Sequence, residues 1–175
     1  MQIHDKQFEI FISSEKIKVR IRELAAQINS DYKTKNPLFL SILNGAFIFT
    51  ADMFREINIP AEVSFIKLKS YRKMESSGKV KELLGLEHNI FGRNIIIVED
   101  IVDTGNTLNH ILREFEQLGT KSIEILTLLH KPEATKNPVS LKYVGFEIPD
   151  KFVVGYGLDY DGYGRNLADL YKIVD

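Results

Sequence analysis

The feature that most constrains the fold of this chain is a short apolar run that leads, through a polar loop, straight into an amphipathic helix. Residues 94–98 read NIIIV, a pattern typical of a strand buried on both faces of a parallel sheet. Apolar residues then recur at helical spacing, and Gly119 is predicted to end that helix. They are Leu108, Ile111, Leu112, Phe115 and Leu118. The segment therefore predicts a strand–loop–helix unit of an α/β protein.

Segments of these two kinds alternate along the rest of the chain. Short apolar runs predict further strands at 38–43, 61–68, 122–129 and 152–155. Helical spacing predicts one helix after Ser13 or Ser14, either of which can cap it, and another over 46–57. The alternation favours an α/β fold with a doubly wound, mainly parallel sheet flanked by helices. Such sheets bind ligands beyond the carboxyl ends of their strands.

Composition limits what such a chain can do. With 175 residues, 44% of them hydrophobic, the chain is long enough to build one core without disulfides. Lys and Arg number 23 and Asp and Glu 24, so the net charge of −1 gives no electrostatic signature of nucleic-acid or anionic-membrane binding. We therefore expect a single domain over residues 1–175, with no nucleic acid and no membrane as partner.

The absence of cysteine narrows the chemistry further. It excludes disulfides, thiolate catalysis and cysteine-ligated zinc, and it suits a cytoplasmic protein. The four histidines are scattered and lack the spacing of a histidine metal site. The N-terminus does not read as a signal peptide, and no run approaches the roughly 20 apolar residues of a membrane span. We expect a cytoplasmic location.

The stretch 70–92 differs from the rest of the chain. It is polar with little periodicity, and a long irregular stretch inside a compact domain is usually functional or disordered. Two interpretations stay open: a loop with a role in function, and a mobile hairpin with none.

Chemistry concentrates in the loop between the NIIIV strand and the following helix. Residues 104–107 read TGNT and would offer backbone amides, hydroxyls and the positive end of the helix dipole to an anion, most naturally a phosphate. Glu99, Asp100 and Asp103 lie just upstream and would repel a phosphate that came alone. A sugar phosphate can bind both the TGNT segment and these acids, because it presents hydroxyls as well as a phosphate. A sugar diphosphate also brings Mg²⁺. Taken singly, these residues can instead be strand ends and helix caps.

Two blocks resemble one known family. Residues 98–108, VEDIVDTGNTL, resemble the phosphoribosyl-pyrophosphate motif of type I phosphoribosyltransferases, and are most similar to the hypoxanthine-guanine subfamily. Residues 144–160, VGFEIPDKFVVGYGLDY, resemble the purine-side segment of that subfamily. The resemblance covers roughly 38–165. It implies a type I phosphoribosyltransferase fold with a core of about 36–160, a small hood built from the N-terminal and C-terminal segments, and a mobile lid over about 70–92.

The first block implies roles on the phosphoribosyl side. The acidic pair Glu99 and Asp100 would hold the ribose hydroxyls, directly or through Mg²⁺. The loop 103–107 would wrap the 5′-phosphate, and its members are Asp103, Thr104, Gly105, Asn106 and Thr107. Asp103 would also be the general acid/base that faces purine N7.

The second block and its neighbours imply the purine side. Lys131 would donate to purine O6, Phe152 would stack on the base, and the backbone of Val153 would contact the base edge. Asp159 would help to hold a second Mg²⁺ or a water near the base. Arg165 would reach the pyrophosphate with its charged fork.

Two further segments complete the implied site. Asn44 and Gly45 lie where the family has its pyrophosphate loop, with a non-proline cis peptide. Many members carry Lys before this glycine, so Asn44 is a departure. Ser70 and Tyr71 match the start of the lid, whose closure would exclude water from the reaction.

The implied function is Mg²⁺-dependent purine salvage. The phosphoribosyl group of 5-phosphoribosyl 1-pyrophosphate would pass to hypoxanthine or guanine, giving inosine or guanosine monophosphate and pyrophosphate. Relatives are dimers or tetramers, so a homo-oligomer is expected. Two alternatives stay open: a non-catalytic regulator that senses the phosphoribosyl ligand on the same fold, and a relative with another base specificity, such as one that prefers xanthine or a pyrimidine.

Overall fold

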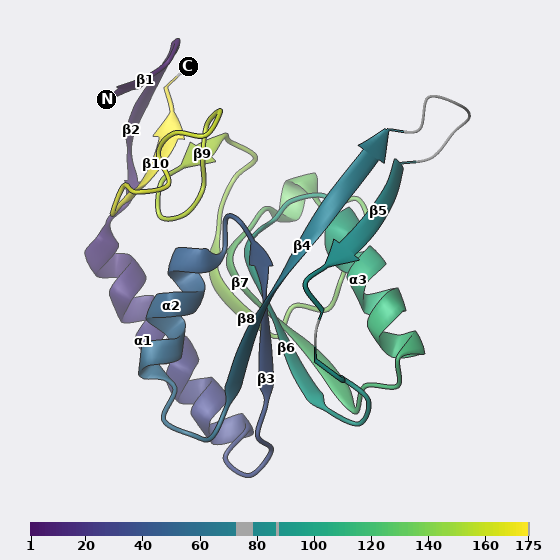
Figure 1. Cartoon of the computed structure of the whole chain (residues 1–175). Coiled ribbons are helices and arrows are strands. Elements are labelled where there is room, and N and C mark those ends of the chain that lie inside the picture. The colour runs from purple at the N-terminus through teal and green to yellow at the C-terminus, as the bar shows by residue number, and fades with distance from the viewer. Residues whose placement is uncertain (73–78, 87, 175) are drawn as a thin grey trace.

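The structure of the chain is a computed structural model that describes residues 1–72, 79–86 and 88–174. Figure 1 shows two sheets, a large one flanked by helices and a small one next to both chain termini. The large sheet has the strand order β5-β4-β3-β6-β7-β8. Its bounds are Lys79–Leu84 for β5, Glu62–Arg72 for β4, Leu38–Leu43 for β3, Asn94–Val102 for β6, Ser122–His130 for β7 and Tyr143–Glu147 for β8.

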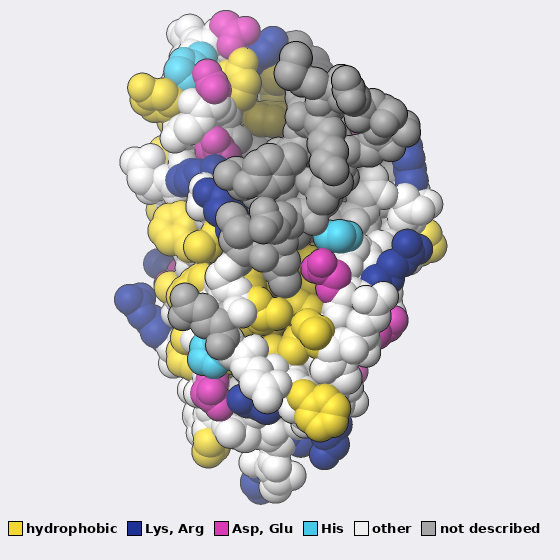
Figure 2. Space-filling view, turned by 45° about the vertical axis from the view of Figure 1, so that its right-hand side comes forward, with side chains coloured by type: hydrophobic (Ala, Val, Ile, Leu, Met, Phe, Trp, Pro, Cys, Tyr) yellow, Lys and Arg dark blue, Asp and Glu magenta, His cyan; other side chains and the backbone are white. Residues whose placement is uncertain are grey.

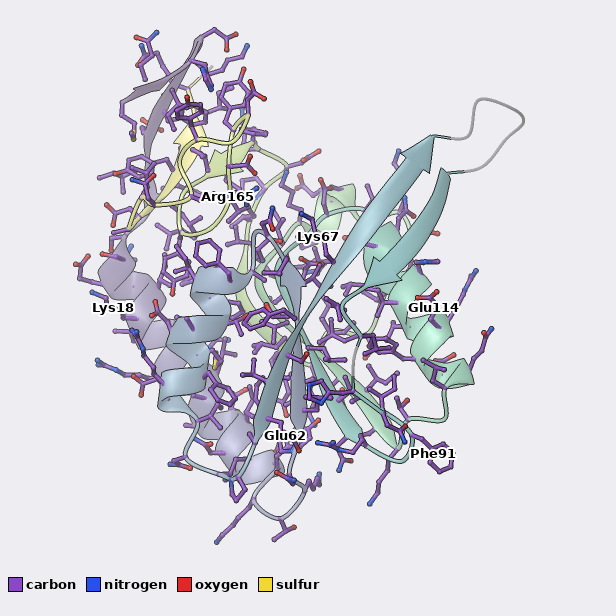
Figure 3. The ribbon with its side chains drawn as sticks, viewed as in Figure 1. Lys18, Glu62, Lys67, Phe91, Glu114 and Arg165 are labelled. Carbon is purple, nitrogen blue, oxygen red and sulfur yellow. The ribbon has the colours of Figure 1, made fainter. Side chains whose placement is uncertain are left out.

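Helices cover both faces of the large sheet, because its strands present apolar side chains on both sides. In the central strand β6, Ile96 and Val98 pack with the residues of α1 (Ser14–Asp31) and α2 (Phe47–Glu56). The alternate residues Ile95 and Ile97 pack with those of α3 (Asn106–Gln117). Lys18 on α1 and Glu114 on α3 mark the two outer layers (Figure 3). This arrangement confirms the predicted doubly wound α/β fold, with β4, β3, β6, β7 and β8 parallel.

The small sheet forms a hood beyond the carboxyl ends of the parallel strands (Figure 1). Its order is β1-β2-β10-β9. The bounds are Gln2–Ile3 for β1, Lys6–Ile12 for β2, Leu170–Ile173 for β10 and Val153–Val154 for β9. The hood thus joins the first and last parts of the chain. The division into a hood and a core of about 36–160 stays a prediction, although α1 packs on the large sheet.

Some predicted elements differ from the structure. The predicted fifth parallel strand, 152–155, is the two-residue β9 of the hood, and β8 takes the fifth parallel place instead. An apolar run such as FVVG does not reveal which sheet it will join, because any buried strand has that pattern. The strand predicted to end at residue 98 continues to Val102, since β6 pairs with β7 up to His130. The first helix is capped by Ser13, and Gly119 follows α3 with φ of 71°.

The stretch 70–92 is only partly irregular. β4 continues to Arg72, and β5 pairs with it antiparallel, with Ser70 opposite Lys81 and Tyr71 opposite Val80. The prediction of an irregular loop is therefore wrong for 70–72 and 79–84. The rest of the predicted lid includes residues 73–78 and 87, which lie outside the described residues. Among the described helices, none has the length and apolar character needed to cross a membrane.

Candidate active site

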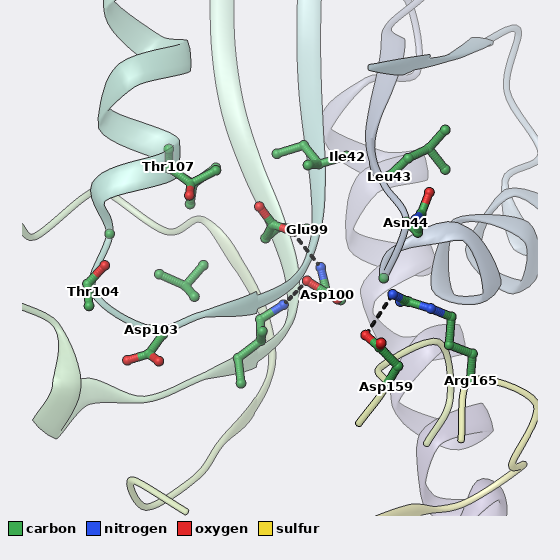
Figure 4. A pocket seen from close by; sticks show the side chains of 15 residues that line it. Ile42, Leu43, Asn44, Glu99, Asp100, Asp103, Thr104, Thr107, Asp159 and Arg165 are labelled. Atoms are coloured by element: carbon green, nitrogen blue, oxygen red, sulfur yellow. Dashed lines mark hydrogen bonds and ion pairs between the residues drawn. The ribbon is translucent and has the colours of Figure 1, made fainter. Parts of the chain in front are cut away.

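A cavity of about 400 Å³ opens at the carboxyl ends of β3 and β6. Figure 4 shows it between the loop that leads into α3 and the loop that carries Asp159 and Arg165. It brings together most of the residues that the sequence singled out. They are Asn44, Gly45, Glu99, Asp100, Asp103, Thr104, Gly105, Thr107, Asp159 and Arg165. The cavity therefore joins segments more than a hundred residues apart in the sequence.

The loop 103–107 is shaped for the start of a helix. Gly105 has φ of 80°, a conformation that favours glycine, and a side chain there would overlap the carbonyl oxygen of Asn137. Gly105 is also the N-cap of α3 and brings no capping side chain. The amides of a first helical turn have no partner within the helix, and the dipole makes this end positive. The cavity wall at Thr104 and Thr107 can therefore receive an anion.

The acidic pair lies just before that loop in the chain, within β6. Glu99 is buried, and its Oε1 accepts the Asp100 amide at 3.2 Å. Asp100 Oδ1 accepts the Ile101 amide at 2.8 Å. The Asp100 carboxylate lies so close to Gly45 that any side chain at position 45 would overlap it. Gly45 thus makes room for an acid from a neighbouring strand.

The turn after β3 and the loop 155–165 form the other wall. The peptide bond from Leu43 to Asn44 is cis, a feature that the sequence alone left open. Gly157 has φ of 103°, and a side chain there would overlap the carbonyl of Gly45. The two segments therefore pack backbone against backbone at this point.

Arg165 and Asp159 hold the loop 155–165 in shape. Arg165 Nη2 lies 2.6 Å from Asp159 Oδ1, and its Nη1 donates to the Gly157 carbonyl at 2.7 Å. Asp159 Oδ2 accepts the Gly162 amide at 2.7 Å. Both side chains still line the cavity, and a guanidinium has five N–H groups with which to bind an anion.

A buried tyrosine anchors the same loop to α2. The Tyr156 hydroxyl donates to Asp52 Oδ2 at 2.6 Å. Burial, and then the hydrogen bond to Asp52, raise the pKa of Tyr156 well above its usual value. Tyr156 was not singled out from the sequence. Its position inside the VVGYGLDY block was the available signal, but an apolar-rich block gives no indication of a hydroxyl partner in a distant helix.

Of the predicted purine-side residues, Asp159 lines the cavity, whereas Lys131, Phe152 and Val153 lie outside its described lining. The Lys131 amide donates to the Val102 carbonyl at 2.9 Å, which places Lys131 beside the lining residue Val102. Its side chain is only 9% exposed, and Nζ lies 3.0 Å from Asp150 Oδ1. Phe152 is 44% exposed, with its ring 5.6 Å from that of Tyr160.

The other predicted residues also have definite places. Val153 is buried within β9 of the hood. Asn106 begins α3 and accepts a hydrogen bond from Asn137 at 2.6 Å. The backbones of Ser70 and Tyr71 lie near the end of β4, outside the described lining of the cavity.

The donor set suits a hard cation. Glu99, Asp100 and Asp159 line the same cavity and offer only carboxylate oxygens. Among the described residues, no group of three or more potential ligands forms a compact metal cluster. Mg²⁺ typically takes one or two carboxylates and completes its shell with water and substrate phosphates, so these residues fit that ion.

Comparisons with known proteins agree with this geometry. The family described as phosphoribosyl transferase domain matches residues 10–161. The hypoxanthine-guanine phosphoribosyltransferase of Bacillus subtilis is 42% identical over 168 residues, covering 95% of this chain and 93% of that protein. The Aquifex aeolicus protein of the same name is 39% identical over 176 residues, covering 99% of each. A solved hypoxanthine phosphoribosyltransferase from Staphylococcus aureus has a TM-score of 0.89 at 35% identity, covering 97% of this chain and 92% of that one.

These relatives confirm both the resemblance read from the two sequence blocks and the type I phosphoribosyltransferase fold. The family match spans the strand–loop–helix unit and the cavity lining as far as Asp159, and it ends before Arg165 and β10. This chain belongs to the phosphoribosyltransferase family.

Proposed function

We propose that this protein is a purine salvage enzyme. It transfers the phosphoribosyl group of 5-phosphoribosyl 1-pyrophosphate to hypoxanthine or guanine, and it releases pyrophosphate and a nucleoside monophosphate. One observation carries the proposal: a helix start suited to an anion and the acids Glu99 and Asp100 line one cavity. A phosphorylated sugar satisfies both features at once, since its phosphate meets the helix start and its hydroxyls meet the carboxylates.

The phosphoribosyl half of the ligand occupies the large-sheet side of the cavity. The loop 103–107 holds the 5′-phosphate, with Asn106 at its helical end. Glu99 and Asp100 bind the ribose hydroxyls, directly or around Mg²⁺, and Asp159 is the third candidate ligand. When bound, Mg²⁺ supplies positive charge that offsets the negative charge gathering on the departing pyrophosphate.

Asp103 is the proposed catalytic residue. It is exposed, and it lies on the loop between the acidic pair and the start of α3. As N9 of the base bonds to the ribose carbon and the pyrophosphate leaves, the purine loses a proton, which a carboxylate at N7 can accept. The sugar then carries positive charge in the transition state, and the neighbouring carboxylates stabilise it electrostatically.

The base and the pyrophosphate are assigned to the residues beyond this loop. Lys131 donates to the 6-oxo group, Phe152 stacks on the ring, and Val153 contacts the base edge through its backbone. Arg165, with the amide of Gly45 and the side chain of Asn44, holds the pyrophosphate. For Lys131, this contact requires its ammonium to turn from Asp150 or to bind both groups, which three N–H donors allow.

Three further features stay predictions. The segment of about 70–92, beginning at Ser70 and Tyr71, is proposed as a lid over the cavity. A cytoplasmic location is proposed because it suits a chain without cysteine.

A homo-oligomer is the third proposed feature. Apolar side chains gather on one face in Figure 2, and exposed apolar residues of this chain include Phe91 at 74% and Leu118 at 48%. Such exposed apolar groups are typical of surfaces that another subunit covers. Light scattering on the purified protein measures the mass in solution: the expected result is a dimer or a tetramer, and a monomer at all concentrations contradicts this part of the proposal.

The decisive experiment supplies 5-phosphoribosyl 1-pyrophosphate and Mg²⁺ with hypoxanthine, guanine or xanthine, and measures nucleotide formation. We expect turnover with hypoxanthine and guanine. Asp103→Asn is expected to lower kcat by about 10²–10⁴-fold, because it removes the proton acceptor. Binding of the phosphoribosyl ligand without turnover by the wild type favours the regulator instead, and faster turnover of xanthine favours a different base specificity.

A further inference from the structure

We infer that Thr135 and Asn137 are positioning residues that hold the phosphate-binding loop 103–107 from behind, and we call this pair the brace. The inference rests on the proposed function, because it takes that loop as the site of the 5′-phosphate. Neither residue belongs to the two blocks that resemble the family, and neither lies in the described lining of the cavity.

The brace donates hydrogen bonds to two backbone carbonyls and one side chain of the loop. Thr135 Oγ1 donates to the Asp103 carbonyl at 2.8 Å. The Asn137 amide donates to the Thr104 carbonyl at 3.1 Å. The Asn137 side chain then donates through Nδ2 to Asn106 Oδ1 at 2.6 Å. Contacts from one short segment thus run along most of the loop.

The next carbonyl of the loop is held from the same side. Asn109 Nδ2 donates to the carbonyls of Gly105 and Asn137, each at 3.1 Å. Gly105 also packs so tightly against the Asn137 carbonyl that a side chain would overlap it. The carbonyls of Asp103, Thr104 and Gly105 therefore all accept hydrogen bonds from the brace or from Asn109.

The direction of these carbonyls fixes the direction of the amides. In a planar trans peptide unit, the C=O of one residue and the N–H of the next point in opposite directions. With the carbonyls of Asp103, Thr104 and Gly105 turned toward their donors, the amides of Thr104, Gly105 and Asn106 turn away from them. A phosphate site needs amides preset in this way, because ordering them on binding costs affinity.

The brace also contacts the base side. The Thr135 hydroxyl lies 2.9 Å from the Lys131 carbonyl, and Lys131 N donates to Val102 O at 2.9 Å. A hydroxyl has one proton, so it serves one carbonyl at a time. Removing it takes this donor from the Asp103 carbonyl, whereas the Lys131 carbonyl still accepts the Ala134 amide at 3.2 Å. Substitution of Thr135 should therefore weaken the hold on the loop more than substitution of Asn137 does. The backbone contacts of Asn137 remain when its side chain is removed.

The test compares Thr135→Val, Thr135→Ser and Asn137→Ala with the wild type. Thr120→Val is the matched control, because the Thr120 hydroxyl donates to the Phe115 carbonyl at 3.3 Å beyond the end of α3. We expect Thr135→Val to raise the KM for 5-phosphoribosyl 1-pyrophosphate about tenfold and that for hypoxanthine less than threefold. Asn137→Ala should raise the first KM about threefold. Thr135→Ser keeps the hydroxyl, so its KM for 5-phosphoribosyl 1-pyrophosphate should equal that of the wild type. Thr120→Val should change neither KM value.

Several outcomes overturn the inference. One is a KM for the phosphoribosyl ligand within twofold of wild type in both Thr135→Val and Asn137→Ala. Another is an equal rise in both KM values together with a fall in Tm, since that marks general loosening. If Thr135→Val does not fold, Asn137→Ala and Thr135→Ser decide alone. A wild type that neither binds nor turns over the phosphoribosyl ligand overturns the proposed function itself, and the brace falls with it.

Discussion

The two walls of the cavity are built in different ways. The wall at 99–107 consists of one continuous segment, in which a strand of the large sheet passes through a loop into α3. The wall at 155–165 belongs to an irregular segment that leaves the hood and is held by Tyr156, Asp159 and Arg165. The order of strand, loop and helix in the first wall follows its own sequence, and Thr135 and Asn137 hold its loop from behind. The second takes its shape from contacts with α2, with the turn at Gly45 and within itself.

The comparison predicts at which residue each wall is most sensitive to substitution. Both depend on a glycine that packs against a backbone carbonyl, Gly105 against Asn137 and Gly157 against Gly45. A side chain at position 105 would displace the loop that is proposed to hold the 5′-phosphate. A side chain at position 157 would push apart the two segments of the second wall. Substitutions at the two glycines therefore test the walls separately.

The largest effect is expected for Gly105→Ala. The new methyl group meets a backbone carbonyl at φ of 80°, so the loop must move by an ångström or more, and misplacement of that size is costly in catalysis. We expect kcat/KM for 5-phosphoribosyl 1-pyrophosphate to fall by about 100-fold. Gly92→Ala is the control, because Gly92 has φ of 68° with nothing within 4 Å. A Gly105→Ala enzyme with wild-type kcat/KM contradicts the assignment of this wall.

A smaller effect is expected for Gly157→Ala on the second wall. The methyl group would push the loop 155–165 from the Gly45 carbonyl and shift Arg165 with it. We expect kcat/KM to fall by about 30-fold, measured with the same assay. Gly162→Ala shares the positive φ, at 86°, but has nothing within 4 Å, so it should stay within about threefold of wild type. Equal losses in the two variants would show that backbone strain, not the contact with Gly45, is responsible.

Arg165→Lys probes the same wall without adding bulk. Lysine keeps the charge but lacks the planar fork that reaches Asp159 and the Gly157 carbonyl together. We expect kcat/KM to fall by about tenfold. Arg22→Lys provides the control, because the Arg22 side chain is 67% exposed at its ion pair with Glu56. If Arg165→Lys matches the control, the fork is not needed at this wall.

The smallest effect concerns stability rather than turnover, and it tests the packing at the C-terminal end of α1, outside the described lining of the cavity. Tyr32 is 2% exposed at the end of α1, and burial, with Glu124 and Asp31 nearby, raises its pKa to about 12. A raised folded-state pKa favours folding fully below the unfolded value of 10.0, and this contribution disappears as pH rises toward 12. At pH 11, about 1.4 kcal/mol of it should be lost.

Tyr32→Phe should remove that alkaline loss, because phenylalanine has no proton to release. Urea unfolding at pH 9 and pH 11 measures the free energy of unfolding of both proteins. We expect the wild type to lose more free energy between the two pH values than Tyr32→Phe does. Tyr163→Phe serves as control, since the Tyr163 residue is 64% exposed and should parallel the wild type. Parallel losses in all three proteins contradict the attribution to Tyr32.

Prediction from the sequence succeeded where the signal is local. The run at 94–98, the stripe from Leu108 to Phe115 and the cap at Ser13 indicated their elements because periodicity and capping act over a few residues. The strand predicted at 152–155 does form as β9, but in the hood and not in the parallel sheet, and the prediction missed β1, β2, β5, β8 and β10. A short apolar run has the same pattern in either sheet, and the choice depends on partners far along the chain.

The same division applies to the cavity. In the segment 99–107, chain connectivity alone placed acids beside the start of a helix, and the motif of this segment indicated the family. Tertiary structure alone decided that Gly45 yields space to Asp100, that Gly157 meets Gly45, and that Thr135 and Asn137 lie behind the loop. The physical reason is that hydrogen bonds and close approaches between distant segments depend on three-dimensional distance, which a sequence pattern encodes only for neighbours.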